Sequence, residues 1–268
     1  MEASVLADFA AYLLTGAVAG LAAGLLGIGG GLIIVPALAL LFRGQEFAAA
    51  TLMHYAVGTS LAAIVPTSIA SLLAHQRRGS VHWVAVGGLT PGILAGALAG
   101  AWLAQQVSSK GLGVLFGVFE VLVALQLLAG ARPSAHRALP RAAGMSAAGG
   151  VIGTLSALLG IGGGTLTVPF LLWHRVDIRM AVGTAAACGL PIAVAGAAGF
   201  AVAGMSAIAA PGFSSGFIYW PAVAGVTLAS VLLAPVGARL AHYLPRQVLQ
   251  RVFALVLAVV GLKMISGA

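Results

Sequence analysis

The chain has 268 residues, of which 61% are hydrophobic and only 7% are charged, and its formal net charge is +8. This balance excludes an ordinary soluble globular protein, and the basic residues lie between apolar runs instead of forming a patch for nucleic acid. Uncharged runs longer than the ~20 residues that cross a hydrocarbon core cover 9–42, 47–74, 79–109, 142–174 and 180–238. We therefore expect a multi-pass protein of the cell (inner) membrane. Its expected partner is the lipid bilayer, and we expect no binding of nucleic acid.

The first apolar run, 9–42, is too long for one membrane crossing and too short for two. As a continuous helix it would measure about 51 Å. A glycine cluster at 27–31 divides the run into pieces of about 9–26 and 31–42, and the second piece is short. We predict a helical hairpin that returns to its starting side. Three ordinary spans follow, at about 48–74, 82–105 and 111–130.

The second half of the chain repeats this order. Two matched motifs lie 133 positions apart: Gly27-Ile28-Gly29-Gly30-Gly31 with Val35-Pro36, and Gly160-Ile161-Gly162-Gly163-Gly164 with Val168-Pro169. The repeat predicts a second broken hairpin in 142–174, then spans at about 181–203, 218–240 and 248–266, with a turn at 204–216. The expected fold class is an all-α integral membrane protein with about ten helical segments. It is divided into an N-terminal transmembrane repeat (1–131), a linker (132–141) and a C-terminal repeat (142–268).

The basic residues predict how the chain crosses the membrane. If each glycine-broken run returns to its own side, one face keeps only Arg43, Lys110 and Lys263. The other face collects ten arginines: Arg77, Arg78, Arg132, Arg137, Arg141, Arg175, Arg179, Arg239, Arg246 and Arg251. The positive-inside rule then makes the arginine face cytoplasmic and places both termini outside. Each half crosses an odd number of times, so we predict that the halves are inverted relative to one another, as in many transporters.

The two glycine breaks predict an anion site near the middle of the membrane. Each break precedes a short helix, and a helix N-terminus offers partial positive charge and free N–H donors. We expect the substrate to be held by Gly29, Gly30, Gly31, Gly162, Gly163 and Gly164, with hydroxyl donors from Thr59, Ser60, Thr184 and Thr165. Two alternatives stay open: the glycines only allow close helix packing, and the hydroxyls only bond their own helix backbone.

Few other side chains are candidates for chemistry. Glu120 lies in the middle of a span, and an intramembrane carboxylate is a candidate for proton coupling, although a structural, protonated glutamic acid is an equal alternative. His75, Arg77 and Arg78 end a span on the expected cytoplasmic side, where they either attract anions to a mouth or only fix topology. No catalytic or metal-binding constellation is present in the sequence, so we predict no enzyme activity, no cofactor and no metal.

Several of these motifs together resemble the TauE/SafE family of sulfite and sulfonate exporters. The first half carries the glycine motif with Val-Pro, then Ala56-Val57-Gly58-Thr59-Ser60-Leu61, Thr67-Ser68 and His75-x-Arg77-Arg78-Gly79-x-Val81-x-Trp83. The second half agrees through its own glycine motif, Ala181-Val182-Gly183-Thr184 and Gly237-Ala238-Arg239-Leu240-Ala241. The resemblance spans almost the whole chain. It implies export of a small anionic sulfur compound, such as sulfite, sulfoacetate or a related organosulfonate.

Membrane energetics agrees with export. An inside-negative potential drives each unit of negative charge outward by roughly 2.3 kcal/mol per 100 mV, so an anion exporter can run without a coupling ion. Two alternatives remain at this point: a proton-coupled uptake carrier that uses Glu120, and a channel for a small anion. The sequence also leaves a homo-oligomer open.

Overall fold

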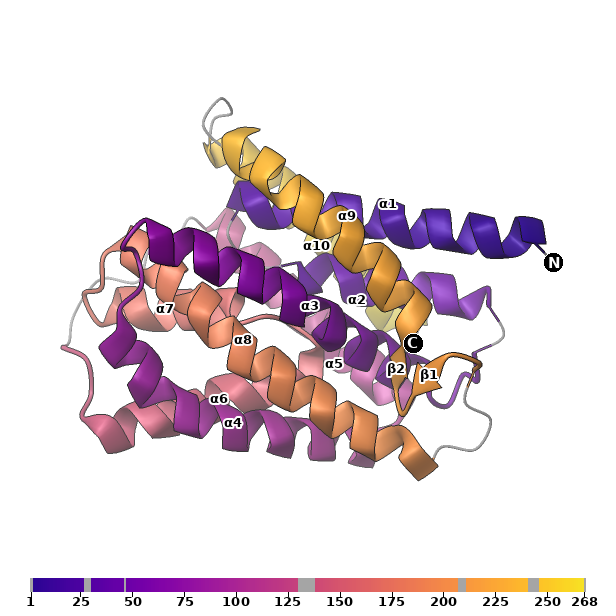
Figure 1. The fold of residues 1–268 in the computed structure, drawn as a ribbon, viewed down its shortest axis with the longest axis horizontal. Helices are drawn as coiled ribbons and strands as arrows, with labels where there is room; N and C mark the ends of the chain where they lie inside the picture. The colour runs from indigo at the N-terminus through magenta and orange to yellow at the C-terminus, as the bar shows by residue number, and fades with distance from the viewer. Residues whose placement is uncertain are drawn as a thin grey trace.

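The computed structural model describes residues 2–26, 30–45, 47–129, 138–206, 211–240 and 246–267. Within these ranges eight helices are long and apolar enough to cross a membrane, and α2 and α7 are shorter. The all-helical membrane fold is confirmed (Figure 1). The helices are α1 (Glu2–Leu26), α2 (Gly31–Arg43), α3 (Leu52–Arg77), α4 (Trp83–Gln106), α5 (Ser109–Leu128), α6 (Ala142–Leu159), α7 (Gly164–Trp173), α8 (Ile178–Ala203), α9 (Trp220–Leu240) and α10 (Arg246–Gly267).

Two details differ from the sequence-based expectation. Helix α1 begins at Glu2 instead of near residue 9, because a few charged residues at a membrane surface do not prevent helix formation. The expected turn at 204–216 contains a 3₁₀ turn, η1 (Gly204–Ser206), and the first strand of a small hairpin. That hairpin pairs β1 (Ser214–Ser215) with β2 (Ile218–Tyr219) and leads into α9.

The α1–α2 pair is a hairpin that returns to the end where it began. The Tyr12 hydroxyl, in the first half of α1, donates a hydrogen bond to the side chain of Gln45, just after α2. The Arg43 guanidinium donates to the carbonyl oxygen of Gly267 at 2.8 Å. The start of α1, the end of α2 and the end of α10 therefore lie at one end of the molecule, which we call the terminal end. Figure 1 shows the N- and C-termini at this end.

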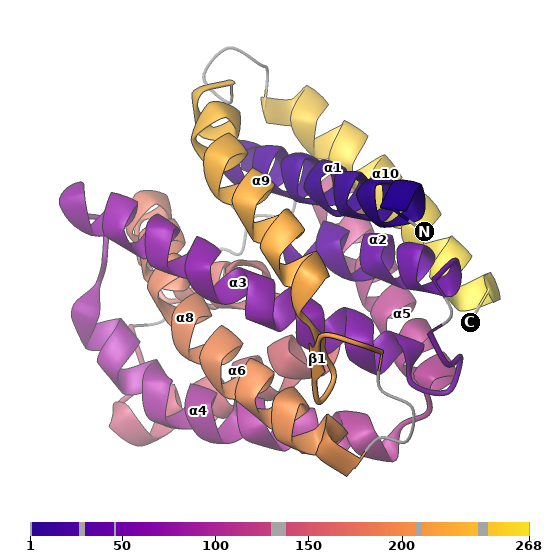
Figure 2. The same cartoon turned by 45° about the vertical axis from the view of Figure 1, so that its right-hand side comes forward.

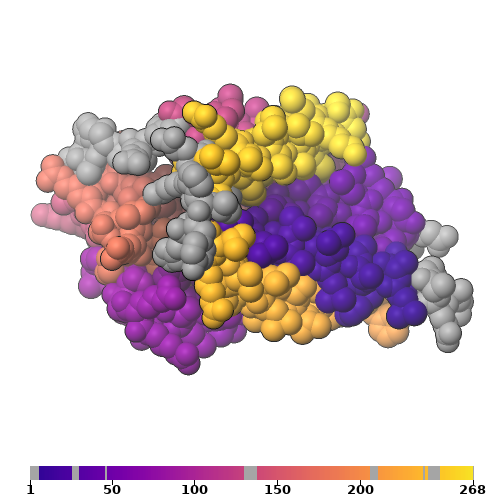
Figure 3. Space-filling view, turned by 90° about the horizontal axis from the view of Figure 1, so that it is seen from above, coloured from indigo at the N-terminus to yellow at the C-terminus, as the bar shows by residue number. Residues whose placement is uncertain are grey.

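The principal helix pairs each combine one helix from each half of the chain. Helix α1 packs against α9, α4 against α6, α3 against α8 and α5 against α10. Figure 2 shows α1 and α10 above the α3–α8 layer, with α9 reaching down to α3, and Figure 3 shows the indigo α1 beside the orange α9 and near the yellow α10. The two repeats therefore interlock instead of forming two separate bundles.

Helices α3 and α8 occupy equivalent places in the two repeats and run antiparallel. Gly58 of α3 faces Phe200 near the end of α8, whereas Ser68, further along α3, faces Gly189 nearer the start of α8. Both helices are membrane spans by length and composition. Because equivalent spans run in opposite directions, the two repeats are inverted relative to one another.

Glycine brings the helix backbones of the interlocked pairs into direct contact. A Cβ atom on Gly149 of α6 would lie 2.2 Å from the carbonyl oxygen of Leu89 in α4. The equivalent contact in the other pair joins Gly16 of α1 to the carbonyl oxygen of Val226 in α9, also at 2.2 Å from the Cβ position. No other residue fits such a distance, so close packing explains these glycines.

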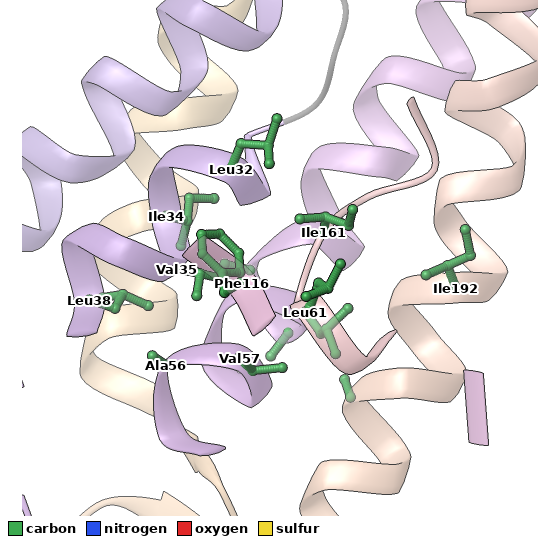
Figure 4. Close-up of a cluster of buried hydrophobic side chains, with 14 of the residues drawn as sticks. Leu32, Ile34, Val35, Leu38, Ala56, Val57, Leu61, Phe116, Ile161 and Ile192 are labelled. Atoms are coloured by element: carbon green, nitrogen blue, oxygen red, sulfur yellow. The ribbon is translucent and has the colours of Figure 1, made fainter. Parts of the chain in front are cut away.

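A buried apolar cluster fills the region between the glycine breaks and the terminal end. Figure 4 shows side chains of α2 and the first half of α3 gathered with residues of α5, α8 and the second break. The labelled members are Leu32, Ile34, Val35, Leu38, Ala56, Val57, Leu61, Phe116, Ile161 and Ile192. Because this cluster fills the interior near the terminal end, a site can open only toward the opposite end of the α3–α8 layer.

Candidate functional site

The second glycine break is fixed by a sharp backbone turn. Helix α6 ends at Leu159 and is capped by Gly160, whose φ of +69° is in the left-handed region that favours glycine. The Ser60 hydroxyl donates to the carbonyl oxygen of this glycine at 2.8 Å. Three residues later Gly163 caps α7 without any side-chain hydrogen bond. The turn therefore leaves the first N–H groups of α7 beside the break.

The two breaks lie against each other. Gly27, Ile28 and Gly29 are outside the described residues, but Gly30 and Gly31 open α2. A Cβ atom on Gly31 would lie 2.7 Å from the carbonyl oxygen of Gly160 and from the Cα of Ile161. The inverted repeats therefore bring their broken segments into backbone contact.

A cavity of about 490 Å³ begins at these breaks. Its walls come from α1, α3, α8 and α9, and most of their lining side chains are small and apolar. It extends to His75, Arg78 and Arg239 at the end of the molecule opposite the termini, which we call the arginine end. Of the predicted substrate-binding residues, its described lining includes Gly30, Gly162, Gly163 and Gly164.

The polar lining of the cavity includes residues that were not predicted. They are Thr67, Ser68 and Ser71 of α3, with Ser230 and Arg239 of α9. A sequence signal for the first three existed: with Ile64, His75 and Arg78 they follow the 3–4 residue spacing of one helix face. For Arg239, the only signal was its place in the last turn of a span.

The predicted hydroxyl donors Thr59 and Thr184 lie in structural contacts. The Thr59 Oγ1 accepts a hydrogen bond from the backbone N–H of Tyr219 at 3.0 Å, and the Thr184 Oγ1 accepts one from the N–H of His82 at 2.9 Å. These backbone donors immediately precede α9 and α4. The repeated Gly-Thr motif thus attaches each central helix to the start of another span. Thr59, Thr184 and Ser60 are fully buried and do not belong to the described lining.

The other candidate residues lie outside this lining as well. Thr165 is half-buried in the first turn of α7, and Arg77 is exposed beside Arg78. Glu120 is 0% exposed, and in the described part of the chain neither carboxylate oxygen has a hydrogen-bond partner. It lies in α5 near Gly261 of α10. The structure thus brings the glycines and the Arg78 mouth together, and keeps Glu120 apart from them.

Comparisons with known proteins agree with this architecture. Residues 12–264 match the family described as "Sulfite exporter TauE/SafE". A probable membrane transporter protein of Haemophilus influenzae is 37% identical, over 94% of this chain and 96% of that protein. The probable membrane transporter proteins YunE and YdhB of Bacillus subtilis are 31% and 28% identical, over 62% and 91% of this chain and 67% and 94% of their own length. No solved structure matches the chain significantly. The chain is therefore a membrane transporter, not an enzyme, and belongs to the TauE/SafE sulfite exporter family.

Proposed function

We propose that the protein is a carrier that exports a small sulfur-containing oxyanion, such as sulfite, sulfoacetate or a related organosulfonate. The observation that carries this proposal is the cavity, which joins the glycine breaks to the arginine end. The substrate is held where the two breaks meet, and the chain orientation of the positive-inside rule makes the arginine end cytoplasmic.

The charges around the cavity support an anionic substrate. Arg78 and Arg239 belong to its lining near the mouth, and both side chains are exposed. Fixed positive charge at a cleft raises the local concentration of anions. At the inner end of the cavity, the N-terminus of α7 offers N–H groups and the positive end of a helix dipole. An anion therefore meets favourable electrostatics at both ends of its path, at the mouth and at the inner end of the cavity.

The closed end supports a carrier in preference to a channel. Between the breaks and the terminal end, the apolar cluster of Figure 4 fills the interior, with Leu61 and Ile161 buried beside the second break. A cavity that reaches only one face must close there and open on the other before its substrate can leave. Inverted repeats supply this alternation, because each half can adopt the arrangement of the other. The membrane potential then drives the anion outward without a coupling ion.

Reconstituted flux tests this proposal directly. Proteoliposomes are loaded with sulfite, sulfate, thiosulfate, taurine or sulfoacetate, and efflux is followed under an imposed potential and, separately, under a pH gradient. We expect flux of at least one sulfur oxyanion that follows the potential. Flux that depends strictly on the pH gradient would favour a proton-coupled uptake carrier, and rates far above those of carriers would favour a channel.

Thiol labelling tests the orientation. In a Cys188→Ser background, Gln76→Cys reports on the arginine end and Gly44→Cys reports on the terminal end. An impermeant thiol reagent applied to intact cells should label the cysteine at position 44 and spare the one at position 76. The reverse pattern would place the arginine end outside and overturn the proposed direction.

A further inference from the structure

We infer that the oxyanion head binds asymmetrically, at the N-terminus of α7 and the Ser68 hydroxyl, in the space above Gly189. This inference rests on the export function proposed above, but names residues that the repeat does not share between the two halves. The first break contributes Gly30 to the wall of the cavity and does not supply an equal second set of donors.

Two hydrogen-bond donors lie close to the side of Gly189 where another residue would carry its Cβ atom. The position that a Cβ atom would occupy on this residue is 3.3 Å from the Ser68 Oγ and 3.5 Å from the backbone nitrogen of Gly163. All three residues belong to the cavity lining. The hydroxyl and the backbone nitrogen therefore lie on the same side of Gly189 at the inner end of the cavity, where a methyl group on this glycine would touch both.

The hydroxyl group of Ser68 is a hydrogen-bond donor that has no acceptor among the described residues. Its side chain is only 8% exposed, yet among the described residues the hydroxyl makes no hydrogen bond. Ser68 lines the cavity, and its oxygen is not among the fully buried polar atoms, so the hydroxyl is open to the cavity. An oxygen atom of a bound anion supplies the missing acceptor, and the cavity gives it access.

The N-terminus of α7 supplies the second contact. This helix has ten residues, Gly163 caps it, and no side chain caps it by a hydrogen bond. Its first N–H groups have no partner within the helix, and its dipole favours negative charge at this end. An oxyanion has several oxygen atoms, so one oxygen can accept from Ser68 while another accepts from the N–H groups of α7.

The first repeat cannot form the same subsite. Its equivalent of Gly189 is Ile64, and the second-repeat equivalent of Ser68 is Ala193. The Ile64 Cδ1 lies 3.3 Å from the Cβ position of Gly31, and its Cγ2 lies 3.7 Å from that of Gly162. An isoleucine and an alanine thus stand at the positions equivalent to Gly189 and Ser68, so the symmetric counterpart of the subsite has neither the glycine nor the hydroxyl.

Binding of sulfite to the purified protein, measured by calorimetry, tests the subsite apart from transport. Ser68→Ala removes a hydrogen bond to a charged ligand, so the affinity of this variant for sulfite should fall about tenfold or more. Ser68→Thr keeps the hydroxyl and should retain most of the affinity. Ser156→Ala is the matched control, because it also removes a buried hydroxyl that has no partner among the described residues, but away from the cavity lining.

Filling the space above Gly189 is the second arm of the test. Gly189→Ala places a methyl group where the donors meet, and its 3.3 Å contact with Ser68 needs only a small shift. We expect sulfite binding to fall about tenfold or more, as for a lost charge-assisted hydrogen bond. Gly150→Ala is the matched control, because its Cβ would meet only Gly92 at an ordinary 3.9 Å.

The outcomes separate the subsite from the export function. Wild-type affinity in both Ser68→Ala and Gly189→Ala overturns the subsite, whatever the flux experiment gives. Binding that depends on Ser68 and Gly189 in a protein without flux keeps the subsite and overturns export. If the wild-type protein binds neither sulfite nor sulfoacetate, both proposals are wrong.

Discussion

The arginine end and the terminal end differ at positions that the repeat makes equivalent. On the terminal side of the breaks, Leu61 of α3 packs against Gly196 of α8, and a Cβ on this glycine would also lie 3.3 Å from Ala157 of α6. Their repeat equivalents are Ala186, Ser71 and Gly24, and all three line the cavity of the arginine end. The same repeated backbone arrangement is therefore closed on the terminal side of the breaks and open on the arginine side. Part of this difference between the two sides is the size of one side chain, because Leu61 has Ala186 as its repeat equivalent.

The two ends also differ in polarity. The cavity lining carries Ser68, Ser71, Ser230, Arg78 and Arg239. The equivalent positions near the closed end are Ala193, Gly196, Ile93, Ala203 and Trp102. The positive charge of the cavity lining therefore lies at the arginine end, in agreement with the proposed capture of an anion there.

The largest effect is expected when the second break is filled. A Cβ on Gly163 would already lie 2.8 Å from the carbonyl oxygen of Ala185, so Gly163→Leu must push α7 away from α8 and fill the inner cavity. We expect sulfite flux in proteoliposomes to be lost. Gly87→Leu is the control, because nothing lies within 4 Å of its Cβ position. Full flux in Gly163→Leu would show that the glycines of this break serve only helix packing and not substrate binding.

The next largest effect is expected from placing a leucine at the open end. Ala186→Leu puts the side chain of Leu61 at its repeat-equivalent position in the cavity. We expect flux to fall about tenfold, which corresponds to about 1.4 kcal/mol in the barrier. Val194→Leu on the exposed face of the same helix should have no such effect. Unchanged flux in Ala186→Leu would show that residue volume at this position does not control the opening.

A smaller effect is expected from neutralising the mouth. In Arg78→Gln with Arg239→Gln, the apparent KM for export at low salt should rise about threefold, because the attraction of anions to the cavity is weakened. The difference should shrink as salt screens the charges. Arg251→Gln removes an exposed charge from α10 and serves as the control. If KM is unchanged while thiol labelling confirms the orientation, these arginines only fix topology.

The smallest effect is expected at Glu120. It lies in the α5–α10 contact away from the cavity, and its repeat equivalent is the apolar Leu257. Glu120→Gln keeps the shape of the side chain, so potential-driven flux should stay within about twofold of the wild type if the residue is not a proton carrier. Loss of flux, together with strict dependence on a pH gradient, would instead make the protein a proton-coupled carrier.

The helices were predictable because the membrane restricts what a chain can form. Every backbone group in the bilayer core needs a partner, so long apolar runs must be helices and a run interrupted by glycines must break. The expected hairpin of 9–42 and its copy in 142–174 follow from this constraint alone. The structure divides both runs at the expected glycines, into α1–α2 and α6–α7, although α1 begins earlier than expected, at Glu2.

The lining of the site was harder to predict, because it depends on contacts between the two halves. Nothing near Thr59 in the sequence indicates that its hydroxyl accepts from Tyr219, 160 residues away. The same is true of Thr184 and His82. Ser68 lies only nine positions beyond Thr59 on the same helix, and helical spacing from Ile64 to Arg78 identifies its face. Which face borders the cavity was decided by α1 and α9.

The interlocking of the helix pairs has a consequence for synthesis. Helix α1 leaves the ribosome long before α9, and α4 before α6, yet their glycine faces fit only these partners. The first half must therefore remain in the bilayer with incomplete packing until the second half is inserted. A truncated first half would keep those faces uncovered, and two fragments made separately would have to find each other to complete the fold. The α1–α9 pair can thus form only after most of the second half has been inserted.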